Sequence, residues 1–250
     1  MSAKIGIVTG GGDCPGLNAV IRAVARTAAH QGWETIGFLG GYDGLLEPAQ
    51  VRPIEYHELD GLLLRGGTIL GTANRGRFAA KTGHGDAQRI PAATLDEARA
   101  TIDKLGVTAL VCIGGDGSLS IAHQLHEHGI PIVGIPKTID NDLAATYMTF
   151  GFDSAVACAT DALDRLHTTA ESHRRVMILE VMGRYAGWIA MMSGIAGGAE
   201  VILIPEIPFR IESVCEAVAA RERLGKHHTI VVAAEAVSYT HLTLPTNREV

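Results

Sequence analysis

The chain has 250 residues, of which 47% are hydrophobic and 19% are charged, so it can bury a substantial core and is not a disordered tail. The net charge of −6 and the aromatic content of 5% argue against a nucleic-acid-binding protein. The uncharged stretch 185–199 is too short and too rich in glycine to span a bilayer, and the N-terminus has no signal-peptide pattern. Four widely spaced cysteines without a C-x-x-C pair predict free thiols. We therefore expect a cytoplasmic protein without a membrane partner.

Short apolar runs alternate along the chain with segments of helical periodicity. The predicted strands are 5–9, 35–39, 109–113, 132–135, 176–181, 201–204 and 230–234. The predicted helices are 17–30, 95–105, 118–128, 154–169, 188–195 and a segment that begins at 211. This alternation predicts an α/β fold with parallel sheets covered on both faces. Segment 45–91 breaks the alternation and is rich in glycine and arginine, as loops that line a site often are.

The first motif, TGGGDCPGLN, lies between the first predicted strand and helix and extends from Thr9 to Asn18. Its glycines allow backbone amides to approach a phosphate, and the start of the following helix favours negative charge. No Gly-Lys-Ser/Thr follows, and the glycine spacing is not G-x-G-x-x-G. The motif alone fits either a phosphate loop or a tight turn without a ligand.

The second motif, GGDGS, extends from Gly114 to Ser118 and also connects a predicted strand to a helix. A carboxylate flanked by glycines at the end of a strand can meet a magnesium ion on a polyphosphate. The alternative is that Asp116 caps a helix that begins near Ser118.

The third motif, PKTIDND, follows the strand predicted at 132–135. Turn chemistry accounts for Asn141 and Asp142, but it does not account for Lys137 and Asp140 at the end of an apolar strand. An aspartate beside a bound hydroxyl can accept its proton as that oxygen attacks phosphorus. The motif therefore indicates phosphoryl transfer.

These motifs, together with LLLRGGTILGTANRGRF and VMGRYAGWIA, occur in the order seen in 6-phosphofructokinases, and the chain resembles that family from Lys4 to about Val237. The resemblance implies two doubly wound parallel-sheet domains with the active site between them. It places a phosphoryl-donor domain at 1–151 and an incomplete fructose-6-phosphate domain at 152–237. Because the family continues beyond this point, we expect a C-terminally truncated chain with a non-native tail at 238–250.

The resemblance also implies roles for individual residues. The donor-binding residues are Gly11, Gly12, Arg75, Gly115, Asp116, Gly117 and Ser118. Asp116 would hold Mg²⁺, and Arg75 would meet the transferring phosphate, with Arg77 as the close alternative. Asp140 is the expected catalytic base and Asp142 its support. The sugar-phosphate residues are Thr138, Ile139, Asp140, Met182, Gly183, Arg184 and Glu235. Arg175 would reach the substrate of a neighbouring subunit in a homodimer or homotetramer.

Two positions bear on the choice of phosphoryl donor. Gly117 favours ATP, because a carboxylate at this position would crowd and repel the α-phosphate. Lys137 is typical of pyrophosphate users, and the pair resembles the mixed-substrate, actinobacterial-type group. We expect an ATP:fructose-6-phosphate phosphotransferase. The alternatives are the pyrophosphate-dependent enzyme, an inactive fragment or non-catalytic binding protein, and a NAD-kinase-like or lipid-kinase-like protein, against which PKTIDND and MGR argue.

Overall fold

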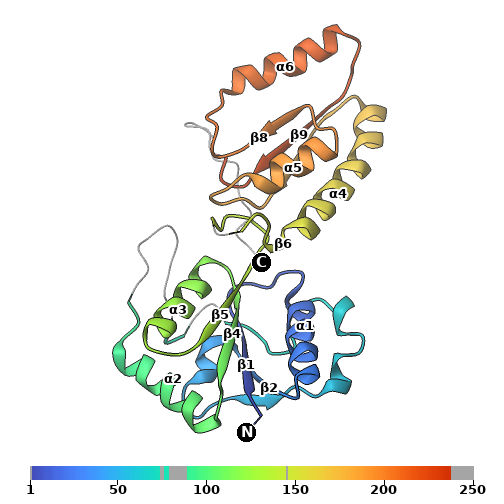
Figure 1. The fold of residues 1–250 in the computed structure, drawn as a ribbon. Coiled ribbons are helices and arrows are strands. Elements are labelled where there is room, and N and C mark those ends of the chain that lie inside the picture. Colours follow the sequence, from blue (N-terminus) through green and yellow to red (C-terminus); the bar gives the residue numbers. More distant parts are fainter. Residues whose placement is uncertain (1, 74–75, 79–88, 145, 238–250) are drawn as a thin grey trace. The chain divides into compact units, whose positions relative to one another are not determined.

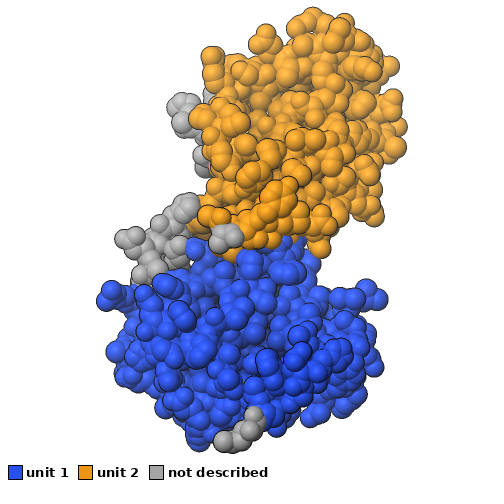
Figure 2. All heavy atoms as spheres, in the orientation of Figure 1, with its two compact units in different colours: residues 1–138, 149–151 blue, residues 139–148, 152–250 orange. Residues whose placement is uncertain are grey.

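The computed structural model describes residues 2–73, 76–78, 89–144 and 146–237. The chain divides into two compact units, which Figure 2 shows in different colours. Unit 1 comprises residues 1–138 and 149–151, and unit 2 comprises residues 139–148 and 152–250. The segment 139–148 therefore clusters with unit 2, although the sequence-based division placed it in the first domain. The tail 238–250 lies outside the described residues.

Unit 1 is built on a six-stranded sheet with the order β3-β2-β1-β4-β5-β6. The strands are β1 (Lys4–Thr9), β2 (Glu34–Phe38), β3 (Val51–Pro53), β4 (Ala109–Gly114), β5 (Ile132–Thr138) and β6 (Phe150–Gly151). All neighbours pair in parallel except β3, which runs antiparallel to β2. The carboxyl ends of β1, β4 and β5 therefore share one edge of the sheet.

Helices cover both faces of this sheet (Figure 1). Successive strand residues point to opposite faces, so Ile7 packs with α1 (Leu17–His30), while Val8 packs with α2 (Ala92–Leu105) and α3 (Asp116–Glu127). The predicted doubly wound α/β architecture is confirmed here.

Segment 45–91 contains structure that its sequence did not reveal. Besides β3, short 3-10 helices lie at Tyr56–Leu59 and Leu62–Leu64, and a further one at Gly41–Leu45 overlaps its start. Elements this short carry no detectable periodicity, and contacts with the rest of the unit hold them. The clearest contact is made by Asn18 of α1, whose buried side chain hydrogen-bonds into the segment.

Unit 2 contains a parallel three-stranded sheet with the order β7-β9-β8. The strands are β7 (Val176–Val181), β8 (Val201–Leu203) and β9 (Thr229–Ala234). α4 (Phe152–His173) and α5 (Trp188–Ala196) cover one face, and α6 (Ile211–Arg223) lies over the other (Figure 1). An apolar cavity of about 520 Å³ lies between α6 and the sheet. Within the described ranges, no helix is both long enough and apolar enough to span a bilayer.

Candidate functional site

The first glycine-rich motif forms the connection between β1 and α1. Gly11 and Gly16 have φ of 80° and 99°, a left-handed conformation that favours glycine. The amide of Gly10 donates to the carbonyl of Ile113 across 2.8 Å, which joins the loop to the end of β4. Gly12 is exposed, so the centre of the loop is open to a ligand.

The second motif packs against the first through Ser118. This buried side chain lies so close that a Cβ at Gly10 would come within 2.6 Å of its Oγ, and a Cβ at Gly114 within 2.2 Å of its Cβ. Both loops therefore need glycine where they meet. The hydroxyl of Tyr42 donates to the Ser118 carbonyl across 2.7 Å and fixes the first turn of α3. Tyr42 is a contributor that sequence reasoning missed, since it lies 76 residues from Ser118.

The third motif brings Lys137 beneath the first loop. The side chain is 3% exposed, and its Nζ donates to the Gly12 carbonyl across 2.6 Å. Burial lowers the pKa of Lys137 from its usual value, while nearby Cys14 and Asp13 act in the opposite direction. An anion bound at the loop would add to this opposing effect and stabilise the charged ammonium.

Gly115 of the second motif lies next to the third motif. A Cβ at Gly115 would lie 3.4 Å from the Lys137 carbonyl oxygen and 3.8 Å from the Thr138 Cβ. α3 begins at Asp116 itself, so the alternative in which Asp116 caps a helix starting near Ser118 is wrong. Asp116 is exposed, and Gly117 follows it in the first turn.

The chemistry of this corner suits Mg²⁺ that arrives with a polyphosphate. Among the described residues, no group of three or more histidine, cysteine, aspartate or glutamate side chains could hold a metal ion. Asp116 offers one exposed carboxylate, and Mg²⁺ commonly binds through one or two carboxylates together with substrate phosphates and water.

The two arginine candidates have different outcomes. Arg75 lies outside the described residues. Arg77 forms a two-point pair with Glu97 of α2, at 3.1 Å from Nη1 to Oε1 and 2.7 Å from Nη2 to Oε2. These hydrogen bonds raise the pKa of Arg77 and lower that of Glu97. Arg77 is therefore already paired with the carboxylate of Glu97.

In unit 2, candidate sugar-phosphate residues gather at the carboxyl edge of the sheet. Met182, Gly183 and Arg184 follow β7, and Glu235 follows β9, which pairs with β7. The amide of Glu235 donates to the Val181 carbonyl across 2.8 Å, so the two strand ends lie side by side.

Asp140 lies in the same unit. The preceding residue, Ile139, packs in a cluster with Val181 and Ile189, which brings partly buried Asp140 near the end of β7. Asp142 is exposed. Between them, Asn141 has a left-handed φ of 51° and donates to the Tyr147 carbonyl across 3.3 Å, which shapes this loop.

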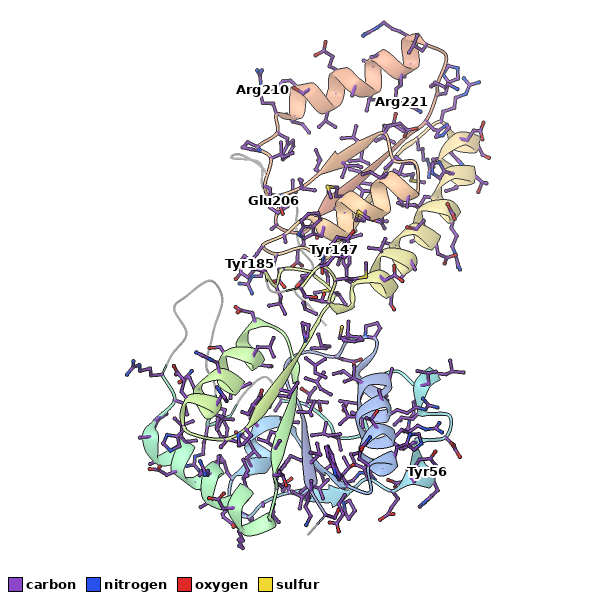
Figure 3. The ribbon with its side chains drawn as sticks, in the orientation of Figure 1. Tyr56, Tyr147, Tyr185, Glu206, Arg210 and Arg221 are labelled. Atoms are coloured by element: carbon purple, nitrogen blue, oxygen red, sulfur yellow. The ribbon has the colours of Figure 1, made fainter. Side chains whose placement is uncertain are left out.

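The positions of Arg175 and Glu206 in unit 2 also bear on the candidate site. Arg175 directly precedes β7 and is exposed, so the strand separates it from Met182 by about 20 Å. The structure therefore does not bring Arg175 together with the other sugar-phosphate candidates. Glu206, which sequence reasoning did not single out, accepts the Gly187 amide across 2.8 Å at the start of α5; Figure 3 labels it together with Tyr185.

Fold and loop geometry first define the class of protein: a doubly wound α/β protein whose glycine-rich turns lie at the carboxyl ends of parallel strands. A family model described as phosphofructokinase matches residues 4–248. The chain belongs to the phosphofructokinase family, as its motifs predict.

Relatives by sequence carry more specific names. The chain is 54% identical over 232 residues to an ATP-dependent 6-phosphofructokinase of Chloroflexus aurantiacus, covering 93% of this chain and 64% of that protein. It is 51% identical over 233 residues to an ATP-dependent 6-phosphofructokinase of the actinobacterium Mycobacterium leprae, covering 93% and 65%. The chain thus spans about two thirds of the length of these relatives.

Solved structures agree with this assignment. The phosphofructokinase of Saccharomyces cerevisiae matches with a TM-score of 0.81 and 32% identity, over 94% of this chain and 34% of that chain. A pyrophosphate-dependent phosphofructokinase of Marinobacter aquaeolei matches with a TM-score of 0.80 and 26% identity, over 95% and 61%. The fold is therefore shared with solved phosphofructokinases, one of which is named pyrophosphate-dependent.

Proposed function

We propose that this chain carries the donor site and part of the sugar-phosphate site of an enzyme that transfers the γ-phosphoryl group of ATP to the 1-hydroxyl of fructose 6-phosphate. The observation that carries the proposal is the convergence of Gly10, Gly114, Ser118 and Lys137 in unit 1, and the names of the sequence relatives agree with it. A cytoplasmic location stays a prediction.

On the donor side, the loop around Gly11 and Gly12 would bind phosphates through its amides, with Lys137 supplying positive charge below. Mg²⁺ on Asp116 would neutralise phosphate charge. Because the protein is acidic as a whole, cations concentrated at this point are needed to offset the charge of the polyphosphate. Arg75 is proposed to meet the transferring phosphate.

On the acceptor side, Asp140 would take the proton of the attacking hydroxyl, with Asp142 in support. Thr138, Ile139, Met182, Gly183, Arg184 and Glu235 would hold the sugar phosphate. Arg175 lies at the other edge of the unit 2 sheet, which supports the proposal that it serves a neighbouring subunit of a homodimer or homotetramer.

The proposed donor is ATP. Gly117 has no side-chain carboxylate that would repel an α-phosphate. The relatives at 51–54% identity are named ATP-dependent. Turnover with ATP and with pyrophosphate, measured on the same protein, decides between the two donors. Faster turnover with pyrophosphate would overturn this choice.

Asp140→Ser tests the proposed base. We expect turnover to fall by about 10³-fold, because the proton acceptor is lost, while fructose 6-phosphate still binds. The assay couples formation of fructose 1,6-bisphosphate to NADH oxidation. Asp153→Ser, which removes an exposed carboxylate from the first turn of α4, is the matched control and should keep normal turnover.

The assay needs two protein forms, because relatives are longer than this chain. One is the 250-residue chain, and the other is the chain extended by the C-terminal part of the Chloroflexus aurantiacus relative. If only the extended form shows turnover, the result would support the alternative that the 250-residue chain is an inactive fragment. Near-normal turnover of Asp140→Ser in an active form would contradict the assignment of the base.

A further inference from the structure

Two neighbouring carbonyl groups of the glycine loop are held by side chains from other segments of unit 1. The hydroxyl of Thr72 donates to the Gly11 carbonyl across 2.6 Å. The ammonium of Lys137 donates to the Gly12 carbonyl, also across 2.6 Å. Both hydrogen bonds are short, and neither donor lies in the loop itself.

These hydrogen bonds determine where the loop amides point. In a trans peptide, the N–H lies antiparallel to the C=O of the same peptide plane. Holding the Gly11 carbonyl therefore turns the Gly12 amide away from Thr72, and holding the Gly12 carbonyl turns the Asp13 amide away from Lys137. Gly11 has a left-handed φ of 80°, as residues do in backbone concavities that bind anions.

The segment that carries Thr72 is itself held against the end of β1. Thr9, the last residue of β1, donates its hydroxyl to the Gly71 carbonyl across 2.7 Å, and its Oγ1 lies 3.1 Å from the Thr68 Oγ1. In return, Thr72 holds Gly11. Hydrogen bonds therefore run in both directions between the β1–α1 connection and segment 68–72, and they hold Thr72 next to Gly11.

We propose that Thr72 is a positioning residue, which orients the Gly11–Gly12 peptide so that its amide faces a phosphate of the bound donor. This inference rests on the proposed function, which supplies the polyphosphate ligand. Thr72 would act through the backbone and would not itself contact the reacting atoms.

The test compares Thr72→Val, which removes the hydroxyl at nearly constant shape, with Thr72→Ser, which retains it. Thr101→Val makes the same atomic change in α2, where the buried hydroxyl has no hydrogen-bond partner among the described residues. Binding of MgATP to the 250-residue chain is measured by calorimetry. We expect Thr72→Val to weaken binding about ten-fold, the effect of a hydrogen bond to a charged ligand. Thr72→Ser and Thr101→Val should stay within two-fold of the unmodified chain.

A second readout needs no ligand. In nitrogen–proton correlation spectra of the unliganded chain, Thr72→Val should shift or broaden the Gly12 amide signal, whereas Thr72→Ser should restore it. Thermal unfolding of the variants identifies any general loss of structure.

The outcomes separate this inference from the proposed function. If the unmodified chain does not bind MgATP, the proposed donor site fails, and the Gly12 amide signal still decides the role of Thr72. If MgATP binds equally to Thr72→Val, or if Thr72→Ser loses as much affinity as Thr72→Val, the positioning role is overturned. An unchanged Gly12 signal in Thr72→Val would overturn it as well.

Discussion

At the residue scale, burial separates the cysteines into two chemical groups. Cys112 of β4 is fully buried, and burial raises the pKa of its thiol to about 12, with a smaller opposing effect from Tyr42. Cys158 and Cys215 are exposed. The thiolate is the reactive form, and at pH 8 only on the order of one Cys112 in ten thousand would be ionised.

We therefore predict that a thiol reagent labels Cys158 and Cys215 rapidly in the folded chain and leaves Cys112 unlabelled. Because the folded-state pKa of Cys112 is raised to about 12, Cys112 should stay protonated and unlabelled when the pH is increased from 7 to 9. Mass spectrometry of the labelled peptides measures the three sites, and unfolding in urea provides the control in which Cys112 reacts. Rapid labelling of Cys112 in the folded chain would contradict its burial.

At the element scale, the buried side chain of Asn18 in α1 hydrogen-bonds to the irregular segment that follows β3. Asn18 is 2% exposed, and its Nδ2 donates to the carbonyls of Arg65 at 3.0 Å and Gly66 at 3.1 Å. Its Oδ1 accepts the amide of Ile69 across 2.9 Å. A buried amide with three such bonds fixes a segment that has no extended secondary structure of its own.

Asn18→Ala should lower the free energy of unfolding by about 2–4 kcal/mol, because it removes three hydrogen bonds made by a buried side chain. Urea unfolding followed by circular dichroism measures the change. Gln31→Ala removes an exposed amide just after the same helix and should change stability by less than about 0.5 kcal/mol. Equal effects of the two substitutions would show that the bonds of Asn18 do not stabilise the unit.

At the scale of the whole molecule, each unit has its own hydrophobic core. Leu110 is fully buried in unit 1, and Leu163 is fully buried in unit 2. Separate cores predict separate unfolding transitions. Leu110→Ala should lower the free energy of unfolding of unit 1, and Leu163→Ala that of unit 2, each by about 2–5 kcal/mol. Each substitution should therefore lower the midpoint temperature of its own unit's transition. Differential scanning calorimetry of the two variants checks this. A single transition lowered by both substitutions would mean that the units unfold together.

Much of the fold was predictable because its signals are local. The predicted helix 17–30 and strand 176–181 coincide with α1 and β7, and the alternation of elements correctly indicated parallel sheets covered on both faces. Differences at other elements are mostly confined to their ends, such as the start of α3 at Asp116. Hydrophobic periodicity and glycine-rich turns are written into neighbouring residues, so they can be read without a structure.

The site was only partly predictable, since its contacts join residues far apart in the chain. Thr72 and Gly11 are 61 positions apart, and Lys137 and Gly12 are 125 apart. No local pattern could indicate that Glu97 pairs with Arg77, or that Tyr42 holds the first turn of α3.

The sequence by itself determined the order of the longer strands and helices, the family and the residue types available for phosphate chemistry, because each of these depends on neighbouring residues. The tertiary structure decided which loops meet, which cations are already paired, and that Glu235 lies beside the end of β7. The physical reason is that close packing and hydrogen bonding select partners by position in space, which a linear pattern does not encode.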